Sequence, residues 1–138
     1  MRRFKETAKG ARVGERVYLT LRDLLFIHGE QIKLFGGADG IRDIDLLLSA
    51  LQRPQSGYHV DLIDEAAVLW ESLTMNHGFV DGNKRVGLAA ADVFLRLNGH
   101  KIHADNATLL AFITDHLEAG RFRKPALEEF LRRHAVPR

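Results

Sequence analysis

The sequence contains no cysteine among its 138 residues, and this absence excludes several kinds of protein. Without thiols there is no disulfide scaffold, thiolate zinc site, iron–sulfur cluster or cysteine nucleophile. The chain also has only three prolines, no low-complexity stretch and no apolar run as long as a membrane helix needs. The N-terminus lacks the apolar core of a signal peptide. We therefore expect a small, soluble, cytoplasmic protein that does not associate with membranes.

A strong excess of charge is missing as well, because 20 Lys and Arg stand against 18 Asp and Glu. The distribution is uneven: residues 1–16 hold six basic and two acidic side chains, and the rest holds 14 basic and 16 acidic. A face that binds nucleic acid would make the folded part basic, so no specific nucleic-acid binding is expected. We predict a basic tail over residues 1–17 and one domain over residues 18–138. The tail is interpreted as a solubilising segment, with non-specific attraction to RNA or a partner-binding arm as alternatives.

Apolar residues recur at helical spacing through almost all of the chain after residue 18. Six helices are expected, and four of them start after a residue typical of an N-cap, namely Thr20, Asp43, Asp61 and Asp105. Pro125 suits the first turn of the last helix. The composition, 46% apolar and 28% charged, is that of an ordinary globular domain. These patterns predict an all-α fold, a compact single-domain bundle of about six helices.

Two features of this bundle follow from the middle of the sequence. The helix expected from Val86 to Leu97 has almost no polar face, so we expect it to be the buried central helix. The helix that starts after Asp61 is expected to reach about His77 and to bury an apolar face that includes His77. Residues 55–60 predict a turn, or at most a short hairpin.

The break between these two helices combines residues that suit phosphate chemistry. It reads His77-Gly78-Phe79-Val80-Asp81-Gly82-Asn83-Lys84-Arg85. The two glycines let consecutive N–H groups turn toward one anion, and the N-terminus of the following helix adds its dipole. Lys84 and Arg85 place positive charge where cations are otherwise unfavourable, which indicates a phosphate ligand.

Three further side chains add reactive groups to this phosphate cradle. Asp81 is a hard oxygen ligand in the place of a phosphate-bound magnesium ion. Asn83 can orient an oxygen atom, and His77 can take a proton from an attacking hydroxyl near neutral pH. A base, a metal ligand and an anion site within nine residues favour phosphoryl or nucleotidyl transfer.

The same nine residues resemble the signature H-x-F-x-[D/E]-G-N-[G/K]-R of the Fic/Doc superfamily. They are most similar to its Doc, or death-on-curing, branch, in which lysine replaces the second glycine. Two other stretches resemble that branch: Gly40-Ile41-Arg42-Asp43 through Leu51-Gln52-Arg53-Pro54, and Val93-Phe94-Leu95-Arg96-Leu97-Asn98-Gly99. The resemblance covers roughly residues 18–131, nearly the whole domain.

The resemblance implies a role for each motif residue. His77 is implied to be the general base, Asp81 the magnesium ligand and Phe79 a core anchor of the loop. Gly82 and Asn83 are implied to form part of the anion-binding nest. The expected catalytic residues are therefore His77, Asp81, Lys84 and Arg85, and the expected cofactor-binding residues are Gly82, Asn83, Lys84 and Arg85.

Two positions depart from the AMP-transferring members of the superfamily. Lys84 stands in the place of a glycine, and Leu88 in the place of a second arginine. In the Doc branch this pattern accompanies a nucleotide whose terminal phosphate faces the acceptor hydroxyl. The resemblance thus implies a protein kinase-like reaction on a Ser or Thr hydroxyl, with ATP and Mg²⁺ as cofactors.

The implied biological role is that of a toxin in a toxin–antitoxin pair. The expected partners are a cognate antitoxin and a target protein, a translation GTPase of the elongation factor Tu kind, whose modification arrests translation and growth. One alternative is AMP transfer on the same fold. Another is a non-catalytic module that binds nucleotide or nucleic acid, against which the near-neutral domain and the His77–Asp81 pair argue.

Overall fold

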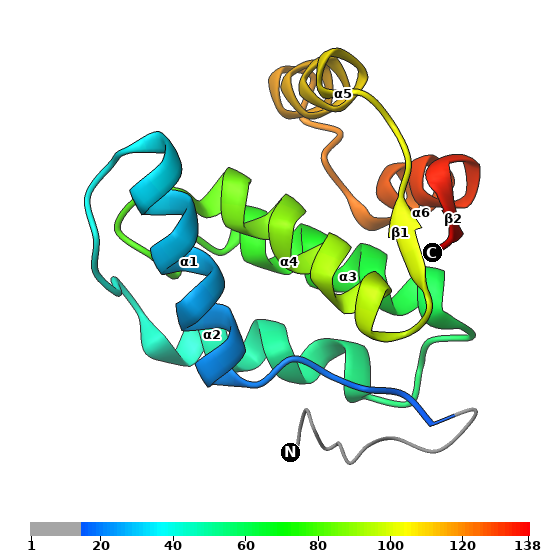
Figure 1. The fold of residues 1–138 in the computed structure, drawn as a ribbon, viewed down its shortest axis with the longest axis horizontal. Coiled ribbons are helices and arrows are strands. Elements are labelled where there is room, and N and C mark those ends of the chain that lie inside the picture. The colour runs from blue at the N-terminus through cyan, green and yellow to red at the C-terminus, as the bar shows by residue number, and fades with distance from the viewer. Residues whose placement is uncertain (1–14) are drawn as a thin grey trace.

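The computed structural model describes residues 15–138 and is mostly helical, so the predicted all-α class is confirmed (Figure 1). The described elements are α1 (Leu21–Phe35), α2 (Ile44–Gln52), the short 3-10 helix η1 (Arg53–Gln55), α3 (Leu62–Met75), α4 (Asn83–Leu97), β1 (His100–Ile102), α5 (Asn106–Glu118), α6 (Lys124–His134) and β2 (Ala135–Pro137). No helix in this part of the chain is long and apolar enough to cross a membrane.

Local capping explains where the helices begin. The Thr20 side chain accepts a hydrogen bond from the Asp23 N–H, and the Asp23 carboxylate accepts one from the Thr20 N–H. This capping box satisfies two backbone donors at the start of α1. The side chains of Asp43, Asp61 and Asp105 accept backbone N–H groups at the starts of α2, α3 and α5. All four predicted N-caps are therefore confirmed.

The buried central helix is α3, and the expectation that α4 holds this place was wrong. Twelve of the 14 residues of α3 are buried, from Leu62 to Thr74, against six of the 15 residues of α4. The helices α2, α4 and α6 all pack against α3, which runs through the middle of the molecule (Figure 1). The neighbouring helices therefore cover only part of the apolar side chains of α4.

The central position of α3 was not predicted because its sequence contains several charged side chains, which are usually exposed. Three of its buried carboxylates each take a cationic partner from another segment. The pairs are Asp64 with Lys124, Glu65 with Arg16 and Glu71 with Arg53, at 2.8, 2.9 and 2.7 Å. Buried charge is tolerated where it is paired and hydrogen-bonded. These pairs link α3 to α6, to the chain before α1 and to η1.

Five apolar side chains whose helical spacing predicts burial lie on the surface instead. They are Leu25 and Phe35 of α1, Ile44 and Leu48 of α2, and Leu110 of α5, which are 38%, 67%, 42%, 41% and 67% exposed. The helix α5 lies at the periphery of the molecule, and Ile113 is the residue that it buries (Figure 1). These three helices therefore carry apolar surface that the described part of the chain leaves uncovered.

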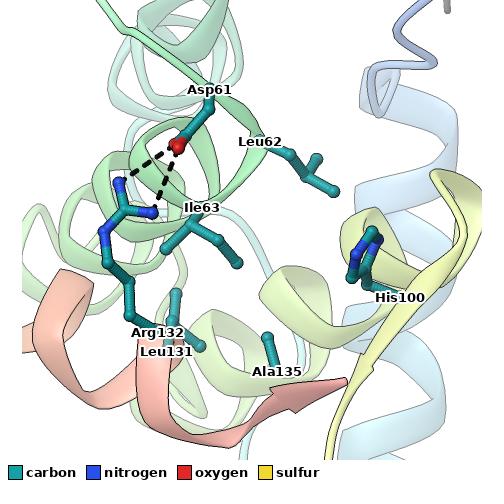
Figure 2. Close-up of a pocket in the computed structure, with 7 residues that line it drawn as sticks. All are labelled: Asp61, Leu62, Ile63, His100, Leu131, Arg132 and Ala135. Carbon is teal, nitrogen blue, oxygen red and sulfur yellow. Dashed lines mark hydrogen bonds and ion pairs between the residues drawn. The ribbon is translucent and has the colours of Figure 1, made fainter. Parts of the chain in front are cut away.

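The chain folds back at its C-terminal end onto the segment that follows α4. Strands β1 and β2 are antiparallel and pair His100 with Pro137, Lys101 with Val136 and Ile102 with Ala135. The basic C-terminal end is attached to the start of α3, because Arg132 donates to both carboxylate oxygens of Asp61, at 3.0 and 3.2 Å. Figure 2 shows this pair beside a cavity of about 460 Å³ between α3, α6 and β1, which no motif residue lines.

Two further expectations concern the turn or hairpin of residues 55–60 and the basic tail. Residues 56–60 form no hairpin, and Tyr58 and Val60 are 89% and 82% exposed. Residues 1–14, most of the predicted basic tail, lie outside the described residues. Near its end, the Val17 N–H donates to the Asn98 side chain at 2.9 Å, which attaches this segment to the end of α4.

Candidate active site

The motif loop, residues 76–82, connects α3 to α4 and lies against the loop that joins α1 to α2. Ile41 and Phe79 form an isolated antiparallel bridge between the two loops. The Val80 N–H donates to the Gly40 carbonyl at 3.0 Å. Figure 1 shows both loops at the same end of the molecule. The motif is therefore held by a segment that lies about 40 residues earlier in the sequence.

Phe79 anchors the motif loop in the core, as the resemblance implies. Its side chain is 2% exposed, and its ring stacks on that of His28 at 3.8 Å with an angle of 4° between the planes. His28 is also buried, and its Nε2 atom lies 2.9 Å from the Asp81 carbonyl oxygen. Because a carbonyl oxygen can only accept, Nε2 carries the proton and donates. His28 is thus a buried, hydrogen-bonded histidine that supports the motif loop.

Asn83 closes the motif loop with its side-chain amide. Its Oδ1 atom accepts from the Phe79 N–H, and its Nδ2 atom donates to the Phe79 carbonyl, both at 3.0 Å. From the sequence we predicted that this amide orients a ligand oxygen, and its structural role in the loop was not predicted. A signal was present, because Asn side chains at helix starts commonly bond to nearby backbone groups.

Asp81 presents an ionised carboxylate at the start of α4. Oδ2 accepts from the Ala38 N–H at 3.1 Å, and Oδ1 accepts from the Gly82 N–H at 2.8 Å. These two hydrogen bonds, with the nearby charge of Arg85, lower the pKa of Asp81. Gly37 makes room for this group, since a Cβ atom there would lie 2.7 Å from Oδ2. An exposed, ionised carboxylate fits a Mg²⁺ ion that takes its other ligands from phosphate and water.

Gly82 leaves the N-terminus of α4 open to an anion. It is the N-cap residue, and it adopts the left-handed conformation with φ at 81°, which glycine reaches without strain. No side chain caps this helix, so the N–H groups of its first turn have no capping acceptor. Such a helix end is a ready site for a phosphate group.

Lys84 and Arg85 have different surroundings. The Lys84 side chain is exposed, whereas Arg85 donates to the carbonyls of Gly36 and Gln31 at 3.0 and 3.4 Å. These carbonyls lie at the C-terminal end of α1, where positive charge is favourable. The Arg85 guanidinium also lies 5.9 Å from the centre of the Phe35 ring. The charge of Arg85 at the start of α4 therefore has partners in the protein itself, and its contact with phosphate stays a prediction.

His77 is exposed to solvent and does not extend the buried face of α3, so this expectation was wrong. The helix ends at Met75, and His77 has a φ of 55°, which makes it the one non-glycine with positive φ among residues 15–138. The turn carries its ring out of the core. In this position the imidazole can meet a hydroxyl of another protein.

A cavity of about 440 Å³ opens beside Arg85, between α1, α4, β1 and α5. Its volume is within the range of small-molecule sites, roughly 300–1,000 Å³. Leu88, one of the two positions singled out in the sequence, lines it. The other lining residues are Gln31, Leu34, Phe35, Arg85, Ala89, Asp92, Ile102 and Leu109.

Comparison with known proteins places the motif loop within a described family. The model of the Fic/DOC family matches residues 18–95, which include the motif and the loop that holds it. This chain belongs to the Fic/DOC family. The family resemblance inferred from the motif is thereby confirmed, and the match covers α1 to most of α4.

Two curated members are similar to this Fic/DOC protein. The Toxin Doc of Mycolicibacterium smegmatis is 50% identical over 76 residues, which are 51% of this chain and 58% of that protein. The Protein kinase doc of Escherichia phage P1 is 28% identical over 120 residues, 84% of this chain and 94% of that protein. The match thus spans little more than half of the first relative and nearly all of the second.

Proposed function

We propose that this Fic/DOC protein is the toxin of a toxin–antitoxin pair and transfers the γ-phosphoryl group of ATP to a protein hydroxyl. The nine-residue motif, residues 77–85, is the observation that carries this proposal. It combines an exposed histidine, an ionised carboxylate and an uncapped helix N-terminus. The names of the two relatives, a Toxin Doc and a Protein kinase doc, support it.

In the proposed reaction, His77 takes the proton of a Ser or Thr hydroxyl. The hydroxyl oxygen bonds to the γ-phosphorus of ATP, the bond from that phosphorus to the bridging oxygen breaks, and ADP leaves. Asp81 would hold the Mg²⁺ ion, which neutralises charge on the phosphates when bound. The N–H groups of Asn83 to Arg85 and the Lys84 ammonium would bind phosphate oxygens.

The proposed target is a translation GTPase of the elongation factor Tu kind, acted on in the cytoplasm so that translation and growth stop. This target comes from the family resemblance. The exposure of His77 supports a macromolecular substrate, because the residue is open to solvent.

The proposed partner is a cognate antitoxin, and the uncovered apolar surface of α1 and α5 supports it. Leu34, Phe35 and Leu110 are 69%, 67% and 67% exposed, and the first two line the cavity beside Arg85. A Leu34→Glu substitution should weaken antitoxin binding, measured by calorimetry with the purified pair. Unchanged affinity would place the antitoxin elsewhere.

A paired transfer assay tests the reaction. Purified protein, Mg²⁺ and elongation factor Tu are incubated with α-labelled or γ-labelled ATP. We expect γ label alone on the target, lost in His77→Ala and retained in His103→Ala, a control that removes another exposed histidine. Transfer of α label would mean AMP transfer and would overturn the kinase proposal.

Two further results separate the parts of this proposal. If expression arrests growth but elongation factor Tu takes up neither label, the target is wrong. If His77→Ala still arrests growth, the catalytic role of His77 is wrong. A Lys84→Gly variant tests nucleotide orientation: we expect loss of γ transfer, and unchanged transfer would remove Lys84 from that role.

A further inference from the structure

The segment Gly40–Asp43 has no role in the proposed chemistry. Each of its four residues contacts the motif loop. Its contacts are the Gly40 carbonyl with the Val80 N–H at 3.0 Å, the bridge of Ile41 with Phe79, and the N–H groups of Arg42 and Asp43 with the Gly78 carbonyl at 2.8 and 2.9 Å. The backbone of the motif loop is therefore bound to this segment on both sides of Phe79.

The Arg42 side chain adds two hydrogen bonds to the same loop. Its Nε atom donates to the His77 carbonyl, and its Nη2 atom donates to the Asn76 carbonyl at 3.2 Å. Both acceptors follow the last residue of α3, where the helix dipole favours a cation. The rigid fork of a guanidinium suits two neighbouring oxygens, whereas a lysine ammonium offers a single point charge.

These two carbonyls belong to the peptide planes on either side of the His77 Cα atom. The relative orientation of the two planes is set by φ and ψ of His77, so Arg42 holds both angles at once. A φ of 55° is unfavourable for a residue that has a Cβ atom. The bonds from Arg42 oppose relaxation of His77 to an ordinary conformation.

The next residue gives the backbone little freedom to adjust. Gly78 is buried, and a Cβ atom at this position would lie 2.4 Å from Leu47 Cδ2. Its carbonyl already accepts two N–H groups from Gly40–Asp43. Arg42 therefore controls the direction in which the His77 ring leaves the backbone, from a position outside the motif.

We infer that Arg42 is a positioning residue, which holds His77 in its left-handed conformation and so directs the general base toward the acceptor hydroxyl. This inference rests on the proposed function for its effect on rate. Arg42 needs no contact with ATP or with the target. Its side chain works through the backbone of His77.

Steady-state γ transfer in three variants tests the effect on rate. Arg42→Ala should lower kcat by about 10- to 100-fold, because small displacements of a catalytic group have effects of this size. The KM for ATP should change little, since no nucleotide-binding group is removed. The kcat of Arg42→Lys should lie between the kcat of Arg42→Ala and that of the unchanged protein.

The matched control is Arg132→Ala, which removes another arginine that makes several hydrogen bonds, to Asp61 and Glu128, far from the motif in the sequence. It should lower the melting temperature and leave kcat unchanged. An Arg42→Ala variant with an unchanged kcat, or one whose loss of rate matches a loss of folded protein, would overturn the inference.

A second measurement does not depend on the proposed reaction. The ¹³Cα and ¹³Cβ chemical shifts and the HN–Hα coupling of His77 report its φ angle in solution. We expect positive φ in the unchanged protein and in Arg132→Ala, and negative φ in Arg42→Ala. If no protein transfers label, the proposed function fails while these signals still decide the role of Arg42. Positive φ in Arg42→Ala would refute it.

Discussion

His77, Asp81 and Asn83 lie within seven residues of one another, yet each meets a different environment. The His77 ring meets solvent, the Asp81 carboxylate meets two backbone N–H groups, and the Asn83 amide is used up by the Phe79 backbone. Reactive and structural side chains thus alternate along the loop. Substitutions at neighbouring positions should therefore have separable effects on activity and on stability.

Asp81→Asn should separate charge from shape at the proposed magnesium site. Asparagine has nearly the same size but lacks the negative charge that the lowered pKa of Asp81 maintains at neutral pH. The Mg²⁺ concentration for half-maximal γ transfer should rise at least about tenfold. Titration of Mg²⁺ in the transfer assay measures this, and an unchanged requirement would remove Asp81 from the metal site.

Asn83→Ala should destabilise the fold, because it leaves the Phe79 N–H and carbonyl without their side-chain partners. The expected loss in the free energy of unfolding is about 1–3 kcal/mol. Urea unfolding followed by circular dichroism measures it. The control is Asn106→Ala, which alters the exposed first residue of α5 and should have little effect. Equal effects of the two substitutions would contradict the loop-closing role.

At the scale of elements, the contact between α3 and α4 depends on one glycine. A Cβ atom at Gly87 would lie 2.2 Å from Thr74 Oγ1 and 3.3 Å from the Trp70 carbonyl oxygen. Two helices can approach this closely only where a side chain is missing. Since α4 begins with the motif residues, this contact also sets the position of the candidate site relative to the central helix.

Gly87→Ala should therefore force α3 and α4 apart, with a loss of about 1–3 kcal/mol in the free energy of unfolding. Gly29→Ala is the control: Gly29 lies within α1 with nothing within 4 Å of an added Cβ atom. That change should stabilise the protein by up to about 1 kcal/mol, because alanine favours helix. Combining Gly87→Ala with Thr74→Ala should recover part of the loss. Stabilisation by Gly87→Ala alone would refute the packing argument.

At the scale of the whole molecule, ion pairs connect segments that are distant in the sequence. Arg132 in α6 contacts Asp61 at the start of α3 and Glu128 in its own helix. The hydrogen bond from Arg132 is the main cause that lowers the pKa of Asp61, and bonds from Arg132 and Lys124 lower that of Glu128. Both carboxylates bind protons less readily in the folded protein than in the unfolded chain.

Stability should consequently fall in acid. Carboxylates with lowered pKa values stabilise the fold above their ordinary pKa, about 4, and this contribution disappears as the pH falls through the lowered values. Arg132→Gln should reduce the free energy of unfolding at pH 7 and also reduce its decline in acid. Urea unfolding of both proteins at several pH values down to about 2 measures this. An identical decline in the variant would show that other groups govern acid unfolding.

Local chemistry was sufficient to predict the helices and the motif. Thr20, Asp43, Asp61 and Asp105 cap the helices that follow them because a capping bond involves neighbours three or fewer residues away. The motif is likewise continuous in sequence, so its base, carboxylate and glycines could be identified without a fold. The amino-acid sequence by itself therefore determined the all-α class, four of the helix starts and the family.

Long-range contacts decided the rest. The central position of α3 depends on partners such as Arg16, Arg53 and Lys124, each from another segment. The outward turn of His77 and the role of Arg42 depend on a loop from the other side of α2. A pattern along the chain records which side chains are present but not which distant groups satisfy them. Only the tertiary structure brings those groups within hydrogen-bonding distance.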